Sequence, residues 1–339
     1  MIILGIETSC DDTSVALVDA QKSGFKILEN IISSQTKIHK KWGGVVPNLA
    51  KREHEKNLPL ILEEVLKNNK KPDIIAVTYG PGLEPCLWVG VNFAKELAVK
   101  LKKPLIPVNH IESHFLANWI ESNGKNVKFP AIVLIVSGGH TILVLAKEIG
   151  KYKIVGETRD DAAGECFDKV ARILGIGYPG GPIISKKAAE FKKRKYNIKL
   201  PRPMMYQKNY DFSFSGLKTA VLYDFQSRSP KIRKSQDYIR EICFEAQESI
   251  IDVLIKKTIR VARDFKVKSI ILGGGVVANK NLRNKFKETG KELGLEIVIP
   301  SIEYCTDNAV MTAVTAFLNK NKSKNWKTLK ANANLKIGK

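Results

Sequence analysis

Two histidines four residues apart, His110 and His114, are the side chains whose spacing most directly suggests chemistry. They lie in the stretch PVNHIESHF, directly after a short apolar run. Four residues make about one helical turn, so both imidazoles would face one side of a helix and could share a metal ion. Zinc peptidases place a glutamate directly after the first histidine, whereas Glu112 comes one position later. The spacing indicates a metal site without indicating a peptidase.

The helix that would carry this pair has a recognisable start. Asn109 is a good N-cap, which makes Glu112 the third helical residue, where a carboxylate can fold back onto the cap. Near the positive end of the helix, His110 and His114 are expected to stay neutral, the form in which imidazole binds metal. Two histidines bind a metal weakly, so a third ligand that the spacing does not identify must come from elsewhere. Two hydrogen-bonded histidines on an amphipathic helix are the alternative.

Two glycine-bearing turns are candidates for binding phosphate groups. IVSGGHTIL (135–143) and ILGGGVVANKNLR (271–283) each contain an apolar strand followed by glycines. Without Cβ atoms, successive backbone N–H groups can approach phosphate oxygens, and the second turn leads into a helix N-terminus that favours an anion. Neither has the spacing of a P-loop or a Rossmann fingerprint. Each alone could be a tight turn without a ligand, but the two together favour a nucleotide site.

Acidic residues in two further segments are candidates either for chemistry or for ordinary surface charge. Asp11 and Asp12 lie in the turn of a predicted hairpin, where an aspartate normally caps its own backbone but could also orient a reacting group. In the predicted helix DDAAGECFDKVARILG, Asp161, Glu165 and Asp168 share the face opposite the apolar stripe. The residues alone favour a solvated face with ion pairs between neighbouring turns.

Length, composition and charge limit the class of protein. The 339 residues suffice for one large domain or two ordinary ones, and 44% hydrophobic residues exclude wholesale disorder. No apolar run is long enough for a bilayer, and the first residues resemble a buried strand more than a signal peptide. Five scattered cysteines fit a reducing cytosol. A net charge of +22 suits a polyanionic partner such as nucleic acid, although a lysine-rich proteome produces the same excess.

Strands and helices alternate along the chain in a pattern that occurs twice. Residues 1–20 and 130–148 each read as a hairpin of two apolar strands, and a strand, a glycine-bearing loop and a helix follow in both halves. This alternation predicts an α/β fold made of two related lobes with a ligand site in the cleft between them. The lobes are expected to cover 1–128 and 129–318, with a basic, flexible tail over 319–339.

Taken together, the motifs resemble successive blocks of one protein family. The family is TsaD, the tRNA threonylcarbamoyl-adenosine transferases, formerly labelled glycoproteases, and the likeness runs from residue 1 to about 318 with spacing of the bacterial type. It implies a duplicated actin-like (ASKHA) fold with two lobes and a central cleft. The blocks are, in order, ETSCDDTSVAL, GGVVPNLAKREH, GPGLEPCLWVG, NHIESH, VSGGHT, DDAAGECFDK, YPGGP, DFSFSGLKT, GGGVVANKNLR and CTDNAVM.

The resemblance implies a reaction and its partners. Members of the family transfer the threonylcarbamoyl group of threonylcarbamoyl-AMP to N6 of adenosine 37 in tRNAs that read codons beginning with A, and they release AMP. The chain is therefore expected to be an acyltransferase of tRNA modification that works with TsaB-like and TsaE-like subunits and does not bind a membrane. Its expected location is the cytoplasm, or an organelle if the source is eukaryotic.

The resemblance also implies roles for particular residues. It places one divalent metal, Fe²⁺ or Zn²⁺, on His110, His114 and Asp307, and so supplies the carboxylate that the spacing left open. Given that reaction, we take Asp11 as the candidate for helping to remove a proton from N6 of adenine. The adenylate substrate, with ATP or ADP as further candidates for the same cleft, is expected to contact Ile135, Val136, Ser137, Gly138, Gly139, Asp168, Gly181 and Asn279.

Three other functions fit parts of the pattern. A metallopeptidase would need a general base beside a metal-bound water, and Glu112 lies at the wrong position of the turn for that role. A small-molecule kinase of the same fold would transfer a γ-phosphate and would not release AMP. A non-catalytic tRNA-binding or partner-binding subunit would not be expected to keep both histidines, Asp307 and both glycine loops.

Overall fold

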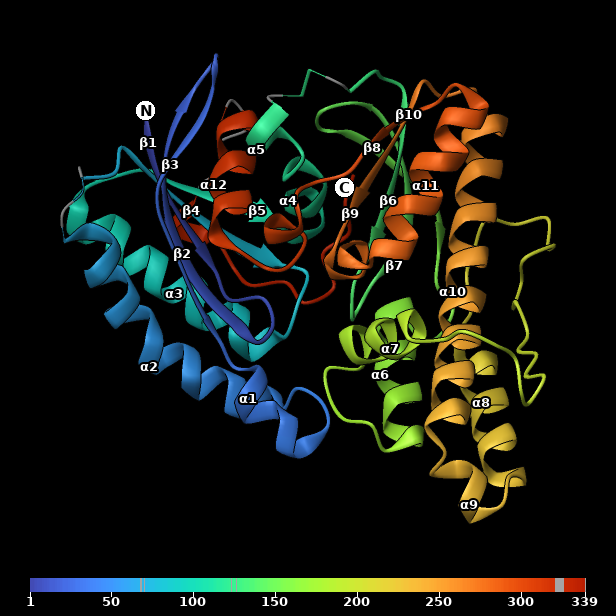
Figure 1. Cartoon of the computed structure of the whole chain (residues 1–339). Coiled ribbons are helices and arrows are strands. Elements are labelled where there is room, and N and C mark those ends of the chain that lie inside the picture. Colours follow the sequence, from blue (N-terminus) through green and yellow to red (C-terminus); the bar gives the residue numbers. More distant parts are fainter. Residues whose placement is uncertain (68, 70, 123, 126, 321–325, 339) are drawn as a thin grey trace. The chain divides into compact units, whose positions relative to one another are not determined.

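Two units make up the chain in this computed structural model, and both contain strands of a five-stranded sheet (Figure 1). The first unit contains Met1–Val127, Glu148–Tyr152 and Pro300–Lys339, and the second contains Lys128–Lys147 and Lys153–Ile299. The structure describes residues 1–67, 69, 71–122, 124–125, 127–320 and 326–338. Residues 321–325 and 339 of the predicted tail thus lie outside the described residues.

The first sheet has the strand order β3-β2-β1-β4-β5. Strand β1 is antiparallel to β2 and parallel to β4, which in turn is parallel to β5. The carboxyl ends of β1, β4 and β5 therefore meet at one edge of the sheet, where Glu7 and Asn109 end their strands. The strands are β1 (Ile2–Glu7), β2 (Asp12–Gln21), β3 (Gly24–Ser34), β4 (Ile74–Gly80) and β5 (Leu105–Asn109).

The second sheet repeats this topology. Its order, β10-β9-β6-β7-β8, equals that of the first sheet read in reverse, with β6 antiparallel to β7 and parallel to β9. The predicted hairpins are the pairs β1–β2 and β6–β7, and the predicted duplication of an α/β fold is confirmed. The strands are β6 (Ala131–Val136), β7 (Thr141–Glu148), β8 (Lys151–Glu157), β9 (Ser269–Gly273) and β10 (Glu296–Val298).

Helices cover both faces of the first sheet. Side chains of α2 and α3, such as Leu58 and Val91, form one apolar cluster with Leu4 and Ile6 of β1. Between these two, Gly5 faces α12, and a Cβ at Gly5 would lie 2.2 Å from the carbonyl oxygen of Ala309, so only glycine allows this approach. The helices are α1 (Thr36–His39), α2 (Pro47–Leu66), α3 (Glu84–Leu101), α4 (His110–Leu116), α5 (Trp119–Ser122) and α12 (Ala309–Leu318).

A long helix, α10, organises the second unit and packs against α7, α8, α11 and β6. Its 29 residues correspond to a length of about 43 Å. Among the described residues, no helix has both the length and the apolar character needed to cross a bilayer. The helices of the unit are α6 (Ala163–Leu174), α7 (Gly180–Ala189), α8 (Ser215–Ser227), α9 (Pro230–Arg233), α10 (Gln236–Asp264) and α11 (Lys280–Leu293).

The C-terminal part of the chain differs from the predicted domain boundaries. Residues 300–318, expected in the second lobe, belong to the first unit together with the rest of the C-terminal segment. The physical reason is α12, whose apolar side chains are almost all buried and which packs on β1 and β2. The first unit is therefore built from both ends of the chain.

The described part of the predicted tail, residues 326–338, is docked on the first unit. Leu329 is buried in the apolar cluster of α2 and α3, and its carbonyl oxygen accepts a hydrogen bond from Lys95 Nζ at 2.6 Å. Asn332 N–H donates to the carbonyl oxygen of Tyr79, at the end of β4, at 2.8 Å. A few apolar side chains and backbone hydrogen bonds thus hold a segment whose overall composition is basic.

Replacing Leu329 with alanine should test this docking in solution. Leu329 is 8% exposed, so Leu329→Ala should lower the free energy of unfolding by about 2–3 kcal/mol. The matched control is Leu60→Ala, because Leu60 is 61% exposed and should change the stability by less than about 0.5 kcal/mol. Urea denaturation followed by circular dichroism would measure both, and equal midpoints for the two variants would contradict the docked tail.

Candidate active site

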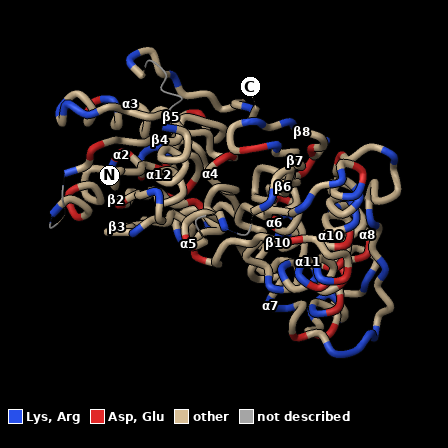
Figure 2. The backbone as a smooth tube through the Cα atoms, turned by 90° about the horizontal axis from the view of Figure 1, so that it is seen from above, with Lys and Arg blue, Asp and Glu red and all other residues tan. Residues whose placement is uncertain are grey.

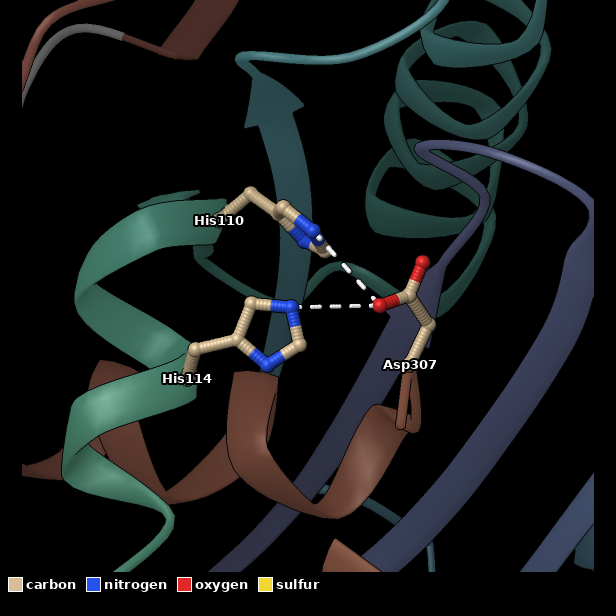
Figure 3. Close-up of side chains that lie close together, drawn as sticks. All are labelled: His110, His114 and Asp307. Carbon is tan, nitrogen blue, oxygen red and sulfur yellow. Dashed lines mark ion pairs between the residues drawn. The ribbon is translucent and has the colours of Figure 1, made fainter. Parts of the chain in front are cut away.

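Two histidines and one aspartate of the first unit converge on one point (Figure 3). His110 and His114 project from α4, and Asp307 lies in the segment before α12. Asp307 Oδ1 lies 3.2 Å from Nε2 of His114 and 3.6 Å from Nε2 of His110. One potential ligand atom from each residue lies within 4.8 Å of the other two. The arrangement brings together the three residues that the sequence analysis assigned to a metal.

Two capped helix starts position these side chains. The Oδ1 of Asn109, at the end of β5, accepts hydrogen bonds from the N–H groups of Ile111 at 2.9 Å and Glu112 at 3.2 Å, which confirms the predicted N-cap of α4. Asn308 caps α12 in the same way by accepting a hydrogen bond from Met311 N–H at 3.0 Å. His110 and Asp307 therefore flank two helix N-termini whose position the caps fix.

A buried carboxylate supports His110 from the side opposite Asp307. Glu7 is fully buried, and its Oε2 lies 3.4 Å from Nδ1 of His110 while accepting a hydrogen bond from Thr78 Oγ1 at 2.5 Å. Ser9 Oγ lies 3.2 Å from the same Nδ1. With Nδ1 engaged by these groups, Nε2 is left to face Asp307, the orientation that a carboxylate imposes on metal-binding histidines.

The charge of His110 differs from the sequence-based expectation. Burial alone would lower the pKa of His110, but the carboxylates of Asp307 and Glu7 outweigh burial and raise the pKa to about 9. In the chain alone the ring is therefore protonated at neutral pH, whereas a neutral ring was predicted from the helix terminus. A cation that binds Nε2 must displace this proton, as is usual for protein metal sites.

The surroundings of His114 fit a bound cation. The residue is 1% exposed, its Nδ1 has no hydrogen-bond partner, and its Nε2 lies 3.2 Å from Asp307 Oδ1 without making a hydrogen bond. A buried imidazole that makes no hydrogen bond is costly, and a cation beside Nε2 would satisfy one of its two nitrogens. Two imidazoles and one carboxylate are a donor set that zinc and ferrous iron accept, with positions left for water or substrate. The residues therefore fit a divalent transition metal.

Glu112 does not fold back onto the helix cap, and this prediction was wrong. Its Oε1 accepts hydrogen bonds from Tyr152 Oη at 2.7 Å and Asn319 Nδ2 at 2.8 Å. These two partners hold the carboxylate off the cap, and its position two residues after His110, about 200° around the helix, also turns it away from the histidines. Glu112 therefore ties α4 to neighbouring segments and is not available as the general base of a peptidase.

Asp11, in the turn between β1 and β2, and Asp12, the first residue of β2, have carboxyl groups with shifted pKa values. Burial, together with the charge of Asp307, raises the pKa of Asp11. Burial raises the pKa of Asp12 to about 7, although a hydrogen bond with Ser34 opposes the shift, and its Oδ1 has no hydrogen-bond partner. A carboxylate with a raised pKa is a stronger base, so Asp11 can accept a proton more readily than an ordinary aspartate.

A buried histidine that sequence reasoning missed braces this turn. His54 of α2 has no exposed surface, its Nε2 lies 2.9 Å from the carbonyl oxygen of Cys10, and its Nδ1 lies 2.7 Å from Thr13 Oγ1. Burial lowers the pKa of His54, so the ring is neutral and donates from Nε2 while accepting at Nδ1. Glu7 was also missed. The only local signal for it was a charged residue at the end of a continuous apolar strand.

The glycine loop after β6 presents open backbone in the second unit. Ser137 closes the turn, because its N–H donates to His140 O at 2.8 Å and its Oγ accepts from His140 N–H at 3.1 Å. Residues 138–139 are exposed, and a Cβ at either glycine would meet no atom within 4 Å. At Gly164, the start of α6, a Cβ would lie 2.5 Å from Ser137 O. The helix start thus abuts the loop directly.

The second glycine loop lies at the same edge of the sheet. Gly274 follows β9 with a φ of 98°, and a Cβ there would lie 2.4 Å from the carbonyl oxygen of Val136. Because β6 and β9 are parallel neighbours, their carboxyl ends adjoin. From there the chain continues to β7 on one side of the pair and to β10 on the other side. This is the position at which open α/β sheets bind nucleotides. The structure therefore brings Ile135–Gly139 and the second loop together.

The remaining predicted contact residues have partners that shape these loops. Asp168 accepts a hydrogen bond from Gly180 N–H at 2.6 Å, which fixes the start of α7, and Gly181 beside it is open on its Cβ side. Asn279 caps α11 by accepting a hydrogen bond from Leu282 N–H at 3.0 Å, and its Nδ2 donates to Gln247 at 2.7 Å. Asp168 and Asn279 thus have structural roles in addition to any contact with a ligand.

The metal assignment can be tested with two variants on one helix. His114→Ala should lower zinc affinity at least 100-fold because it removes one of three ligand atoms, while Glu112→Gln should bind zinc as the parent does because its carboxylate faces Tyr152. Competition with a chromogenic chelator would measure both affinities. Parental zinc affinity in His114→Ala would remove the histidine pair from the site.

Asp12 provides a test through the pH dependence of stability. Its folded-state pKa of about 7 lies above the ordinary value of 3.8, so charging this group weakens the fold as the pH rises from 3.8 through 7. Asp12→Asn should therefore stabilise the protein, by about 1–3 kcal/mol more at pH 8 than at pH 5. Thermal unfolding at the two pH values would measure the difference, and a pH-independent effect would contradict the raised pKa.

Comparison with known proteins identifies close relatives over the whole chain. A family model described as tRNA N6-adenosine threonylcarbamoyltransferase matches residues 26–314. A protein of that name from Thermosipho africanus is 48% identical over 342 residues, which covers 99% of this chain and 100% of the relative. One from Clostridioides difficile is 44% identical and covers 94% of this chain and 93% of its own.

Solved structures share the fold at low sequence identity. Full-length HypF in its phosphate- and nucleotide-bound form is 12% identical with a TM-score of 0.56, covering 96% of this chain and 47% of that one. A ROK family protein from Streptococcus pneumoniae in complex with sucrose is 13% identical with a TM-score of 0.52, covering 95% and 99%. These likenesses confirm the predicted duplicated actin-like fold. On the family match and the close relatives, the chain belongs to the tRNA N6-adenosine threonylcarbamoyltransferase family.

Proposed function

We propose that this chain transfers the threonylcarbamoyl group from threonylcarbamoyl-AMP to N6 of adenosine 37 in tRNAs that read codons beginning with A, and releases AMP. The observation that carries the proposal is a near-complete alignment with proteins named for this transfer. The convergence of His110, His114 and Asp307 supports it, because a decayed family member would not keep three donors within 4.8 Å.

One divalent cation, Fe²⁺ or Zn²⁺, would be held by Nε2 of His110, Nε2 of His114 and Oδ1 of Asp307. When bound, it supplies Lewis-acid polarisation at the carbamate carbonyl or the adjoining phosphate. Glu7 keeps the His110 ring oriented by engaging Nδ1, and the caps of α4 and α12 keep the three donors at fixed positions. This preorganisation lowers the entropy that positioning would otherwise cost in the transition state.

The adenylate is proposed to bind at the loops of the second unit. Exposed N–H groups at 138–139 suit its phosphate, and the open Gly181 at the start of α7 allows close approach of the nucleotide. The carboxylate of Asp168 suits ribose hydroxyl groups. Asn279, at the end of the second glycine loop, is proposed to contact the nucleotide from that side. ATP or ADP would bind the same loops through the same groups.

Proton removal is assigned to Asp11. N6 of adenine forms a bond to the carbamoyl carbon, the bond from that carbon to the phosphate oxygen of AMP breaks, and AMP leaves with the electron pair. The proton lost by N6 passes to the Asp11 carboxylate, whose raised pKa suits it for this step. Adenosine 37 lies in a single-stranded loop, where a base can be turned out into a pocket. TsaB-like and TsaE-like subunits are proposed as partners, and the cytoplasm as the location.

Reconstitution with purified components tests the proposal. The assay contains the chain, its partner subunits, zinc or ferrous iron, threonylcarbamoyl-AMP and an unmodified tRNA transcript. After incubation the tRNA is digested, and its nucleosides are identified by mass spectrometry. Threonylcarbamoyl-adenosine should form with one AMP per modified base. Asp11→Asn should slow formation about 100-fold or more while leaving zinc affinity unchanged, with Glu112→Gln as the active control. An unmodified nucleoside pool, or ADP release from ATP with a phosphorylated metabolite, would favour the rival functions.

A further inference from the structure

Half of the net positive charge of the chain lies in one short segment of the second unit. Residues 186–234 contain fourteen Lys and Arg and three Asp and Glu, so these 49 residues account for +11 of the net +22. A proteome-wide preference for lysine would raise the charge of the whole surface and would not concentrate half of it in this way. The concentration therefore indicates a surface with a specific use.

Printed contacts join the two most basic stretches of this segment. The loop at 190–199 follows α7 and lies against the start of α10, because Lys195 Nζ pairs with Asp237 at 2.5 Å and Tyr196 Oη lies 3.2 Å from Ser235 Oγ. Ser235 directly follows the stretch 231–234, which includes the end of α9. Figure 2 shows Lys and Arg along the outer loops beside α8 and α10. The two stretches form one end of the second unit.

Part of this charge is neutralised within the protein and part is not. Arg194 pairs with Glu245, and Arg228 with Asp224, so these side chains hold the loops in place. Within the described residues, the lysines of α7 and of the stretches 190–199 and 231–234 that are exposed and have no carboxylate within ion-pair distance are Lys186, Lys192, Lys193, Lys199, Lys231 and Lys234. Such free ammonium groups favour an anionic partner, because the partner can bind them without first breaking an ion pair inside the protein.

The same segment of the chain also carries exposed aromatic rings. Among the described residues of 186–234, the large hydrophobic side chains that are strongly exposed are Tyr206 and Tyr223, at 80% and 66%. Tyr223 lies next to Asp224, whose Oδ1 accepts a hydrogen bond from Tyr238 near the start of α10. A membrane-binding surface would need exposed Leu, Ile or Phe beside its lysines. An exposed tyrosine in a basic segment is typical of proteins that stack nucleic acid bases.

We propose that this end of the second unit, the basic surface formed by the six lysines and Tyr223, binds the phosphate backbone of RNA. The inference rests on the proposed function for the identity of the RNA, a tRNA. Helix α7 touches the second glycine loop, where Asn279 Nδ2 lies 3.4 Å from Ser185 Oγ, and it ends at Ala189, where the basic loop begins. The basic surface therefore belongs to the same unit as the loops that are proposed to bind the adenylate, and α7 connects the two.

A charge-matched pair of variants tests the basic surface. K192Q/K193Q/K231Q/K234Q removes four charges from it, and K266Q/K268Q/K287Q/K291Q removes four exposed charges without ion pairs toward the opposite end of α10. Affinity for an unmodified tRNA transcript is measured between 50 and 250 mM KCl. The first variant should bind at least tenfold more weakly at 100 mM, and its slope of log K against log salt should flatten by about two to four, whereas the control slope stays parental.

A third variant separates stacking from charge. Tyr223→Ser should weaken binding about 5- to 100-fold without altering the salt slope, because a stacked base releases no counterions. Parental slopes in the four-lysine surface variant, or an equal change in the control, would overturn the proposal. So would loss of binding to vesicles of phosphatidylserine and phosphatidylcholine with tRNA affinity intact, since that would make the surface a membrane site.

The outcome is distinguishable from that of the proposed function. In the reconstituted reaction, the four-lysine surface variant should raise the KM for tRNA at least tenfold while kcat at saturating tRNA stays within about twofold, because the surface binds backbone and touches no reacting atom. If the parent chain bound tRNA through these lysines but formed no modified nucleoside, the proposed function would fail and the surface would stand. If the four-lysine surface variant modified tRNA with the KM of the parent, the proposed function would stand and the basic surface would be wrong.

Discussion

The buried carboxylate of Glu7 is the interaction on which the geometry of the first unit's site depends. A fully buried charge costs several kcal/mol unless hydrogen bonds and an opposite charge offset the loss of water. Thr78 Oγ1, the N–H of Ser9 and the ring of His110 supply those contacts, each from the carboxyl end of a parallel strand or the turn beyond it. The parallel pairing of β1, β4 and β5 thus determines where the first imidazole points, and Asp307 and His114 complete the set from α12 and α4.

The same unit retains polar groups that stability alone would remove. Asp12 has a carboxyl oxygen without a hydrogen-bond partner, and neither ring nitrogen of His114 makes a hydrogen bond, although both residues are largely buried. Natural proteins accept such groups where ligands or reactions need them. His54 shows the complementary arrangement, because both of its nitrogens are used to hold the turn that carries Asp11. Side chains with satisfied hydrogen bonds therefore surround a few unsatisfied ones, an arrangement that suits the proposed binding of a cation and a substrate.

Local features of this fold were predictable from the sequence, and long-range ones were not. The hairpins, the cap at Asn109 and the buried stripe of α6 followed from periodicity and side-chain chemistry within a few residues. Asp307 was identified through the family resemblance, because nothing in its own neighbourhood connects it to α4 at the other end of the chain. Glu112 was misassigned for the same reason, since Tyr152 and Asn319, which bind it, are distant in sequence. The docked tail was missed because its composition is basic while Leu329 and Ile337 are buried.

Building the first unit from both ends of the chain has a consequence for its biosynthesis. The ribosome releases β1–β5 early, but α12, which covers one face of that sheet, and the segment that holds Tyr79 emerge last. Until then the face around Gly5 has no cover. All of the second unit is translated in between, so its core can form while the first sheet is still incomplete. The nascent polypeptide therefore passes through a stage in which the second unit has been translated while His110 and His114 still lack Asp307.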